Sequence, residues 1–242
     1  MGIQKENIFR YLPESWSEER KLTGLVIALM FHTVVGYPLV SVMGSSVAIQ
    51  LTNNLVLFAV LLLGLSALTQ SNITRLVLGG IILVAISVRL ARFVFGAHWL
   101  LGWGILLALV ATIAFVSIAL RYAYKEGPVT SQRIQAAVAA YLLIVLAFAL
   151  GHMLISFFIP GAFGFADNKA PNIDDPRFEY IHHYFSISTI TTLGYGDIVP
   201  LHPFARTLAT VEALVGQLYP AILLARLVSL SVVDSEKTHK KK

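Results

Sequence analysis

Hydrophobic residues gather along the chain into long runs with few charges, and polar residues gather between these runs. A helix needs about 20 apolar residues to cross the hydrocarbon core of a membrane. The runs therefore predict six transmembrane helices, at residues 22–40, 55–68, 76–88, 99–120, 134–158 and 204–232. The second and third runs are short, and we expect flanking residues to extend them. The pattern predicts an all-α integral membrane protein.

A seventh apolar stretch differs from the six predicted spans. It follows the loop at 159–177, covers residues 178–192, and is only moderately apolar. About 15 residues are too few to cross the membrane, and irregular backbone at membrane depth must be buried in protein or line a water-filled cavity. We therefore predict a helix that enters the membrane and returns to the same side.

The composition agrees with a membrane protein and excludes some kinds of site. Charged residues make up 13% of the chain and hydrophobic residues 57%; a soluble domain carries about twice that charged fraction. There is no cysteine, so disulfides and thiolate metal sites are excluded. The net charge of +5 comes from basic residues at span ends and in the tail, which indicates membrane-flanking charge and argues against nucleic-acid binding.

The basic residues also predict how the chain crosses the membrane. With both termini in the cytoplasm, 13 of the 18 Lys and Arg residues lie on the cytoplasmic side, as the positive-inside rule favours. Residues 1–21 lack the apolar core of a signal peptide and predict a cytoplasmic segment, with an interfacial helix as one possibility. Residues 233–242 form a basic cytoplasmic tail, and we expect no regulatory domain after the last span. The expected location is the cell membrane.

The re-entrant stretch leads into a short glycine motif, Thr192-Leu193-Gly194-Tyr195-Gly196. This motif resembles the selectivity filter of potassium channels, in which backbone carbonyls replace the hydration shell of the ion. The resemblance implies that these five residues bind K⁺ through their carbonyls and the Thr192 hydroxyl, with Leu193 where the family more often has valine. Pointing successive carbonyls at one axis requires backbone torsions that residues with a Cβ resist, which explains the glycines at 194 and 196. One motif per chain implies a homotetramer, and no cofactor is expected.

Residues beside the motif extend the resemblance. Asp197 follows the second glycine, and Tyr184 and Phe185 stand where an aromatic pair on the pore helix commonly braces the filter tyrosine. Phe185 has no hydrogen-bonding side-chain group, so any bond from the Tyr195 hydroxyl must go elsewhere. The helix ends at Thr191, where its negative dipole end points inward and favours a cation in a central cavity.

Glu212 is the one carboxylate inside a predicted span. A charge within the membrane is costly and usually functional. We expect Glu212 to support the filter from behind by pairing with pore-helix hydroxyls such as Ser188 or Thr189. A protonated glutamate with a structural role is the alternative.

The last span has the features of a pore-lining helix. Gly216 lies where such helices in this family often carry a hinge glycine. Pro220 has no amide hydrogen to donate to the Gly216 carbonyl, so it kinks the helix there. Close helix packing is the alternative reason for this glycine. Helical spacing places Gln217, Pro220, Leu224 and Val228 on one stripe that could face the pore.

Residues 22–120 match the sensor domain of voltage-gated potassium channels by the number of spans and by their placement. A sensor needs several arginines on its fourth span and carboxylates on neighbouring spans to pair with them. The fourth run, 99–120, has no Arg or Lys, and no Asp or Glu occurs between residues 20 and 125. We interpret Arg89 and Arg92 as interfacial anchors and residues 22–120 as a helical scaffold.

The sequence favours a potassium-selective channel that lacks a voltage sensor. Its predicted pore domain covers residues 134–232. The expected partners are three further copies of the chain, membrane lipid and K⁺. The alternatives are the membrane subunit of a potassium transporter and a membrane sensor that no longer conducts. Transporters related to channels carry four degraded filters in one chain, whereas this chain has one full motif. An enzyme is not expected, because no nucleophile arrangement, metal cluster or phosphate loop is present.

Overall fold

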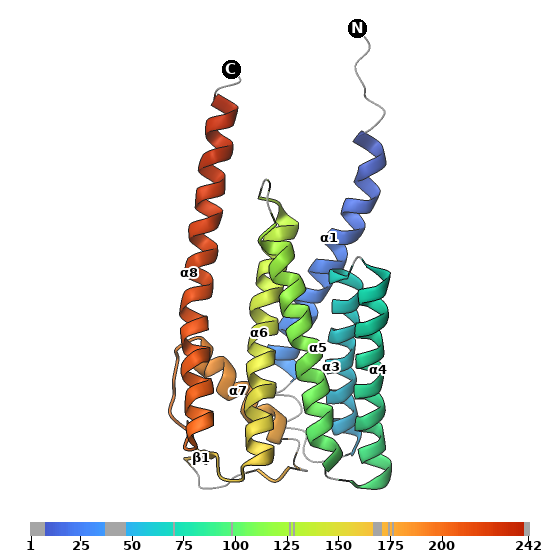
Figure 1. Cartoon of the computed structure of the whole chain (residues 1–242), viewed down its shortest axis with the longest axis vertical. Helices are drawn as coiled ribbons and strands as arrows, with labels where there is room; N and C mark the ends of the chain where they lie inside the picture. Colours follow the sequence, from blue (N-terminus) through green and yellow to red (C-terminus); the bar gives the residue numbers. More distant parts are fainter. Residues whose placement is uncertain are drawn as a thin grey trace.

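The computed structural model describes residues 8–36, 47–69, 71–97, 99–125, 127, 129–166, 171–173, 175 and 177–239. These residues form a bundle of long, roughly aligned helices with one short helix between them and a small two-stranded sheet at one end (Figure 1). The elements are α1 (Ile8–Phe31), the π-helix η1 (His32–Gly36), α3 (Val47–Leu68), α4 (Asn72–Phe95), α5 (Trp99–Ala123), α6 (Ser131–Phe158), β1 (Phe163–Phe165), α7 (Arg177–Ile190), β2 (Ile198–Pro200) and α8 (Pro203–His239).

The helices agree with the apolar runs but differ from them at their ends. Among the described residues, four helical segments are long and apolar enough to cross a membrane, and one further apolar helix, Leu55–Leu68, is shorter. The four segments are Asn72–Ala91, Trp99–Ala123, Ser131–Phe158 and Pro203–Arg226. The structure thus supports a mostly helical membrane protein, and the count of six spans stays a prediction.

Two helices extend beyond the predicted spans. Helix α1 begins at Ile8, so part of the predicted N-terminal segment is continuous with the first span, while the end of that span lies outside the described residues. Helix α8 continues past residue 232 to His239. Helices can continue beyond the membrane, because hydrocarbon thickness limits the apolar run and not the helix.

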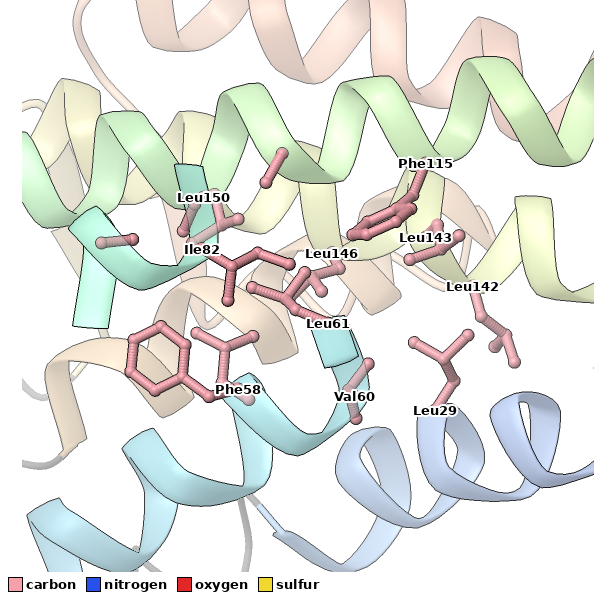
Figure 2. Close-up of a cluster of buried hydrophobic side chains, with 14 of the residues drawn as sticks. Leu29, Phe58, Val60, Leu61, Ile82, Phe115, Leu142, Leu143, Leu146 and Leu150 are labelled. Atoms are coloured by element: carbon pink, nitrogen blue, oxygen red, sulfur yellow. The ribbon is translucent and has the colours of Figure 1, made fainter. Parts of the chain in front are cut away.

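Most of the core lies where α1, α3, α4, α5 and α6 meet. Figure 2 shows side chains from these five helices converging, among them Leu29, Phe58, Ile82, Phe115 and Leu146. Small residues of α5 and α6 are buried in this core, among them Ala108, Ala111 and Ala119 on α5 and Ala139 and Ala140 on α6. On α5, a Cβ at Gly102 would lie 2.7 Å from the Phe157 ring of α6. Small residues allow membrane helices to approach closely and gain van der Waals contact.

The remaining elements place α7 inside the bundle. Helix α7 packs against both α6 and α8, and its 14 residues lie beside the same halves of those two helices (Figure 1). Strands β1 and β2, on either side of α7 in the sequence, pair antiparallel with Gly164 opposite Val199. This sheet adds a small exception to the all-α prediction. The start of α1 and the end of α8 lie at the same end of the bundle, opposite the sheet (Figure 1).

Candidate functional site

The glycine motif begins in a tight turn at the C-terminus of α7. After the helix ends at Ile190, the Thr191 amide donates to the Ile187 carbonyl at 3.1 Å and the Thr192 amide to the Thr189 carbonyl at 3.0 Å. Thr192 then takes a φ of 59°, which is uncommon for a residue with a Cβ. Two carbonyls of the last helical turn are satisfied in this way, and the chain turns away from the helix axis.

Both motif glycines adopt the left-handed backbone conformation. Gly194 has a φ of 57° and Gly196 a φ of 78°, values that side chains with a Cβ resist. Nothing lies within 4 Å of a Cβ built at either position, so torsion and not crowding is the reason for glycine. All residues from Thr191 to Asp197 are exposed on the single chain.

Ser188 connects the motif to the preceding helix. Its carbonyl accepts from the Gly194 amide at 3.1 Å, and its Oγ accepts from the Tyr195 amide at 3.4 Å. The predicted role of Ser188 beside the filter therefore has a matching contact, although its partners are backbone amides and not Glu212. The Thr191 hydroxyl donates to the Ile187 carbonyl at 2.6 Å, within its own helix.

The two residues of the predicted aromatic pair point to different places. Tyr184 stacks on Tyr195 with ring centroids 6.3 Å apart and planes 5° apart, and its hydroxyl donates to Asp197 Oδ2 at 2.8 Å. Phe185 is buried behind the helix, with its ring 4.9 Å from His152 and 5.4 Å from Phe163. Neighbouring helical residues point about 100° apart, so only one of the two braces Tyr195.

The exit of the motif is held by the small sheet. The Asp197 carbonyl accepts from the Ala166 amide at 2.9 Å, and the Asp197 carboxylate accepts from the Ile198 amide at 3.1 Å. Strand β2 then pairs with β1. The chain is therefore fixed to α7 before the motif and to the segment that follows α6 after it.

Glu212 lies in a buried polar cluster on the side of α7 that turns away from the motif. Its Oε2 is 2.8 Å from His152 Nε2 on α6, and its Oε1 contacts the Ser186 hydroxyl on α7. Ser186 Oγ also lies 2.8 Å from the Val145 carbonyl. The partners are thus Ser186 and His152, in place of the predicted Ser188 or Thr189, because Ser186 is on the face of α7 that turns away from the motif. His152 could have been expected here, since polar side chains inside apolar spans pair with one another.

Helix α8 contacts the base of the motif through Gly216 and Gln217. A Cβ at Gly216 would lie 1.9 Å from the Ile190 carbonyl oxygen, so this glycine allows close approach to the end of α7. Gln217 Nε2 donates to Thr192 Oγ1 at 3.2 Å. Pro220 lies one turn later inside the continuous helix. Close packing, the alternative reading of Gly216, has direct support; a hinge at this position stays a prediction.

The predicted stripe on α8 is exposed on the single chain. Leu224 is 63% exposed and Val228 61%, and Gln217 and Pro220 are also exposed. Other apolar residues of α8 are exposed as well, including Leu214, Leu218 and Ile222. The helix therefore has more apolar surface than one chain covers.

Arg89 is buried among the helices, whereas a membrane anchor is expected to be exposed on the surface of the bundle. Its side chain on α4 is 5% exposed and Nη1 lies 3.3 Å from Glu179 Oε1 in the first turn of α7. The prediction of an anchor was wrong here, because the burial of a side chain depends on which helices pack beside it, and one helix's sequence does not give this. Arg92 has no described side chain.

The paired histidines of α7 are buried, and neither faces a metal cluster. His182 Nδ1 lies 2.7 Å from the Phe178 carbonyl, and the His183 ring lies 5.7 Å from that of His32. Across the part of the chain that the structure describes, no three His, Cys, Asp or Glu side chains group as a metal site would require.

Comparison with known proteins assigns the family. The model of an ion channel family matches residues 152–232, from the last two turns of α6 into α8. Protein LctB of Geobacillus stearothermophilus is 30% identical over 102 residues, which cover 40% of this chain and 68% of that protein. This chain belongs to the ion channel family. The residues that the family model spans in this ion channel include the glycine motif, the sheet strand β2 and Glu212.

Two further relatives match shorter parts of this ion channel. Protein LctB of Bacillus caldotenax is 30% identical over 93 residues, covering 36% of this chain and 64% of that protein. The inward rectifier potassium channel Kirbac3.1 of Paramagnetospirillum magnetotacticum is 49% identical over 39 residues, covering 16% of this chain and 13% of that protein. The matches thus span about two thirds of the LctB proteins and a small part of Kirbac3.1. No solved structure matches the chain.

Proposed function

We propose that this ion channel chain is one subunit of a potassium-selective channel, which conducts K⁺ passively down its gradient. The observation that carries the proposal is the segment Thr192–Gly196, called the filter segment below, with left-handed torsions at both glycines. Alternation between left-handed and ordinary torsions lets successive carbonyls turn toward the same side. Rings of such carbonyls are what a K⁺ filter uses to replace hydration water.

The environment of the filter segment favours a cation. The C-terminus of α7 ends directly before it, and a helix C-terminus carries a partial negative charge. Asp197 adds a carboxylate at the other end, held by Tyr184. Similarity to an inward rectifier potassium channel, over 39 residues, supports K⁺ as the ion.

We propose a homotetramer around the filter axis. One filter segment supplies one quarter of a closed ring, and the exposure of residues from Thr191 to Asp197 leaves room for neighbouring copies. Six spans in the cell membrane with both ends in the cytoplasm complete the proposal. The start of α1 and the end of α8 at one end of the bundle support an even number of crossings (Figure 1).

Ion flux into liposomes tests the function. Purified protein should carry K⁺ and Rb⁺ far faster than Na⁺, and external Ba²⁺ should block the flux, because Ba²⁺ resembles K⁺ in size but binds the carbonyl rings too tightly to leave. Gly196→Ala should abolish the flux, since its φ of 78° is strained for a residue with a Cβ and the backbone torsion of the filter segment would change. Gly80→Ala on α4, where nothing lies within 4 Å, is the matched control and should conduct normally. Equal permeability to Na⁺ and K⁺ would refute the proposal.

A further inference from the structure

A buried ion pair connects the leading helices to the start of the pore helix. Arg89 is on α4, near the end of that helix, and Glu179 is in the first turn of α7. Arg89 Nη1 and Glu179 Oε1 are 3.3 Å apart, and the two side chains are 5% and 18% exposed. The partners lie 90 residues apart in the sequence, so this contact joins two distant parts of the chain.

The surroundings of Arg89 are built to hold a guanidinium group. The charge lies over the Phe58 ring of α3, 5.9 Å from its centroid, where an aromatic face attracts a cation. On α5, a Cβ at Gly104 would lie 3.1 Å from Arg89 Cγ, so glycine leaves room for the arginine stem. Three helices of the scaffold therefore position one side chain.

Glu179 is suited to the other side of the pair. A carboxylate in the first turn of a helix is stabilised by the partial positive charge there. Removing one partner of a buried ion pair leaves the other charge without compensation, which is far more damaging than the loss of a surface pair. Movement of the start of α7 away from α4 would have the same effect, so the pair resists that movement.

A second contact from the scaffold reaches the next turn of α7. The His183 ring lies 5.7 Å from the His32 ring at the start of η1, and both side chains are buried. From Glu179 to Ser188 the chain is one unbroken helix, and Ser188 holds the amides of Gly194 and Tyr195. Whatever fixes the start of α7 therefore also fixes the position of the filter segment.

We infer that Arg89 is a positioning residue for ion conduction, which fixes the pore helix to the scaffold through Glu179. The scaffold then has a role without any voltage sensor: its packing sets where α7, and with it the filter segment, is placed. The consequence for flux rests on the proposed channel function, whereas the consequence for the mobility of α7 does not.

The experiment compares single and paired charge changes in the full chain. Arg89→Gln and Glu179→Gln each remove one charge, and the double variant Arg89→Glu with Glu179→Arg restores an ion pair of reversed direction. Arg121→Gln, at the exposed end of α5, is the matched control, because it removes a scaffold arginine that lies outside this contact. Rb⁺ uptake per assembled channel and hydrogen exchange of the amides in 177–197 are measured for each.

Both single variants should slow Rb⁺ uptake about ten-fold or more and speed exchange in α7 by a similar factor, because a buried charge is left unpaired. The reversed pair should recover only part of both, because it restores an ion pair but places a carboxylate over the Phe58 ring and a cation at the start of α7. The control should match the wild type. Should Arg89→Gln fail to assemble, Glu179→Gln carries the same comparison. Single variants with wild-type exchange and uptake, or a reversed pair no better than the single changes, would overturn the inference. If the wild type itself carries no Rb⁺, the proposed function fails, while the exchange of α7 still decides the role of Arg89.

Discussion

At the scale of single residues, glycine meets two different needs in the pore. Gly194 and Gly196 have left-handed torsions and open space around the missing Cβ. Gly216 lies inside helix α8, whose backbone torsions any residue can adopt, but its missing Cβ leaves room for the Ile190 carbonyl. The same residue type therefore serves conformation in the filter segment and close approach in α8.

Gly216→Ala tests close approach directly. The added Cβ would lie 1.9 Å from the Ile190 carbonyl oxygen, and backbone at the end of α7 has little freedom to move away. Overpacking usually costs about 1–3 kcal/mol, and a clash with backbone should lie at or above the top of that range. We expect a lower thermal midpoint in detergent and loss of K⁺ flux. A variant as stable and conductive as Gly80→Ala would show that α8 does not press on α7 in the channel.

The polar cluster at Glu212 predicts a difference between two substitutions. Ser186 has one hydroxyl hydrogen, yet its Oγ lies beside both the Val145 carbonyl and Glu212. If the side chain at 212 donates a hydrogen bond to Ser186 Oγ, the Ser186 hydroxyl is free to donate to the Val145 carbonyl. The amide of glutamine can donate in this way. Glu212→Gln should therefore fold and conduct nearly as the wild type does.

Glu212→Ala should behave differently, because His152 Nε2 loses the Glu212 carboxylate, while Ser186 keeps only the Val145 carbonyl. Each buried polar group left unsatisfied costs about 1–3 kcal/mol. Thermal unfolding of the two variants beside Ser186→Ala measures the difference, with Ser186→Ala expected to fall between them. Equal stability of the alanine and glutamine variants would mean that the cluster does not hold α6, α7 and α8 together.

At the scale of elements, α8 contacts the filter segment and also carries the stripe that the sequence predicts to face the pore, where we place a gate. Gly216 and Gln217 contact the end of α7, and Pro220 lacks the amide that would bond the Gly216 carbonyl. Below this point Leu224 and Val228 are exposed on one chain. Four copies would bring these apolar side chains into a ring that can exclude water and stop ions.

Leu224→Asp should raise the open probability, because a carboxylate in that ring keeps it wet. Leu224→Ile preserves an apolar ring and is the control. Pro220→Ala should change gating and leave ion selectivity unaltered, since it touches the helix and not the filter segment. Single-channel recording measures all three.

A cysteine at Gln217 gives an independent check, since the chain has no cysteine of its own. Rapid modification of that cysteine by a cytoplasmic thiol reagent in the closed channel would place the gate at the filter segment instead.

At the scale of the whole molecule, one chain leaves its functional surface uncovered. The filter segment is exposed and α8 carries several exposed apolar residues, while the scaffold and α6 share a closed core. A ring of identical copies covers such a surface by closed rotational symmetry.

Native mass measurement should therefore find four chains, with a mass of four times 26.5 kDa before bound lipid and detergent are added. The Gly216→Ala variant provides a comparison, because a displaced α7 should weaken contacts between neighbouring filter segments. A conducting monomer or dimer would contradict the tetramer.

Local properties of the sequence determined the helices and the filter segment. An apolar run predicts a membrane helix because hydrocarbon offers no partner to an exposed backbone, and this holds whatever the neighbours are. The α5 and α6 helices accordingly begin and end within a few residues of runs 99–120 and 134–158. A glycine with positive φ is likewise a local requirement, which is why the motif residues could be named from the sequence.

The tertiary structure alone decided which polar residues meet. Glu212 pairs with His152, 60 residues away, and Arg89 with Glu179, 90 residues away. Each pairing depends on which helix faces turn toward one another, and packing of small and large side chains sets those faces over the whole bundle. The sequence pattern placed Phe185 at the filter and Arg89 at the interface, whereas the packed helices bury both. A charge or ring within a span finds its partner only when the fold brings another helix to it.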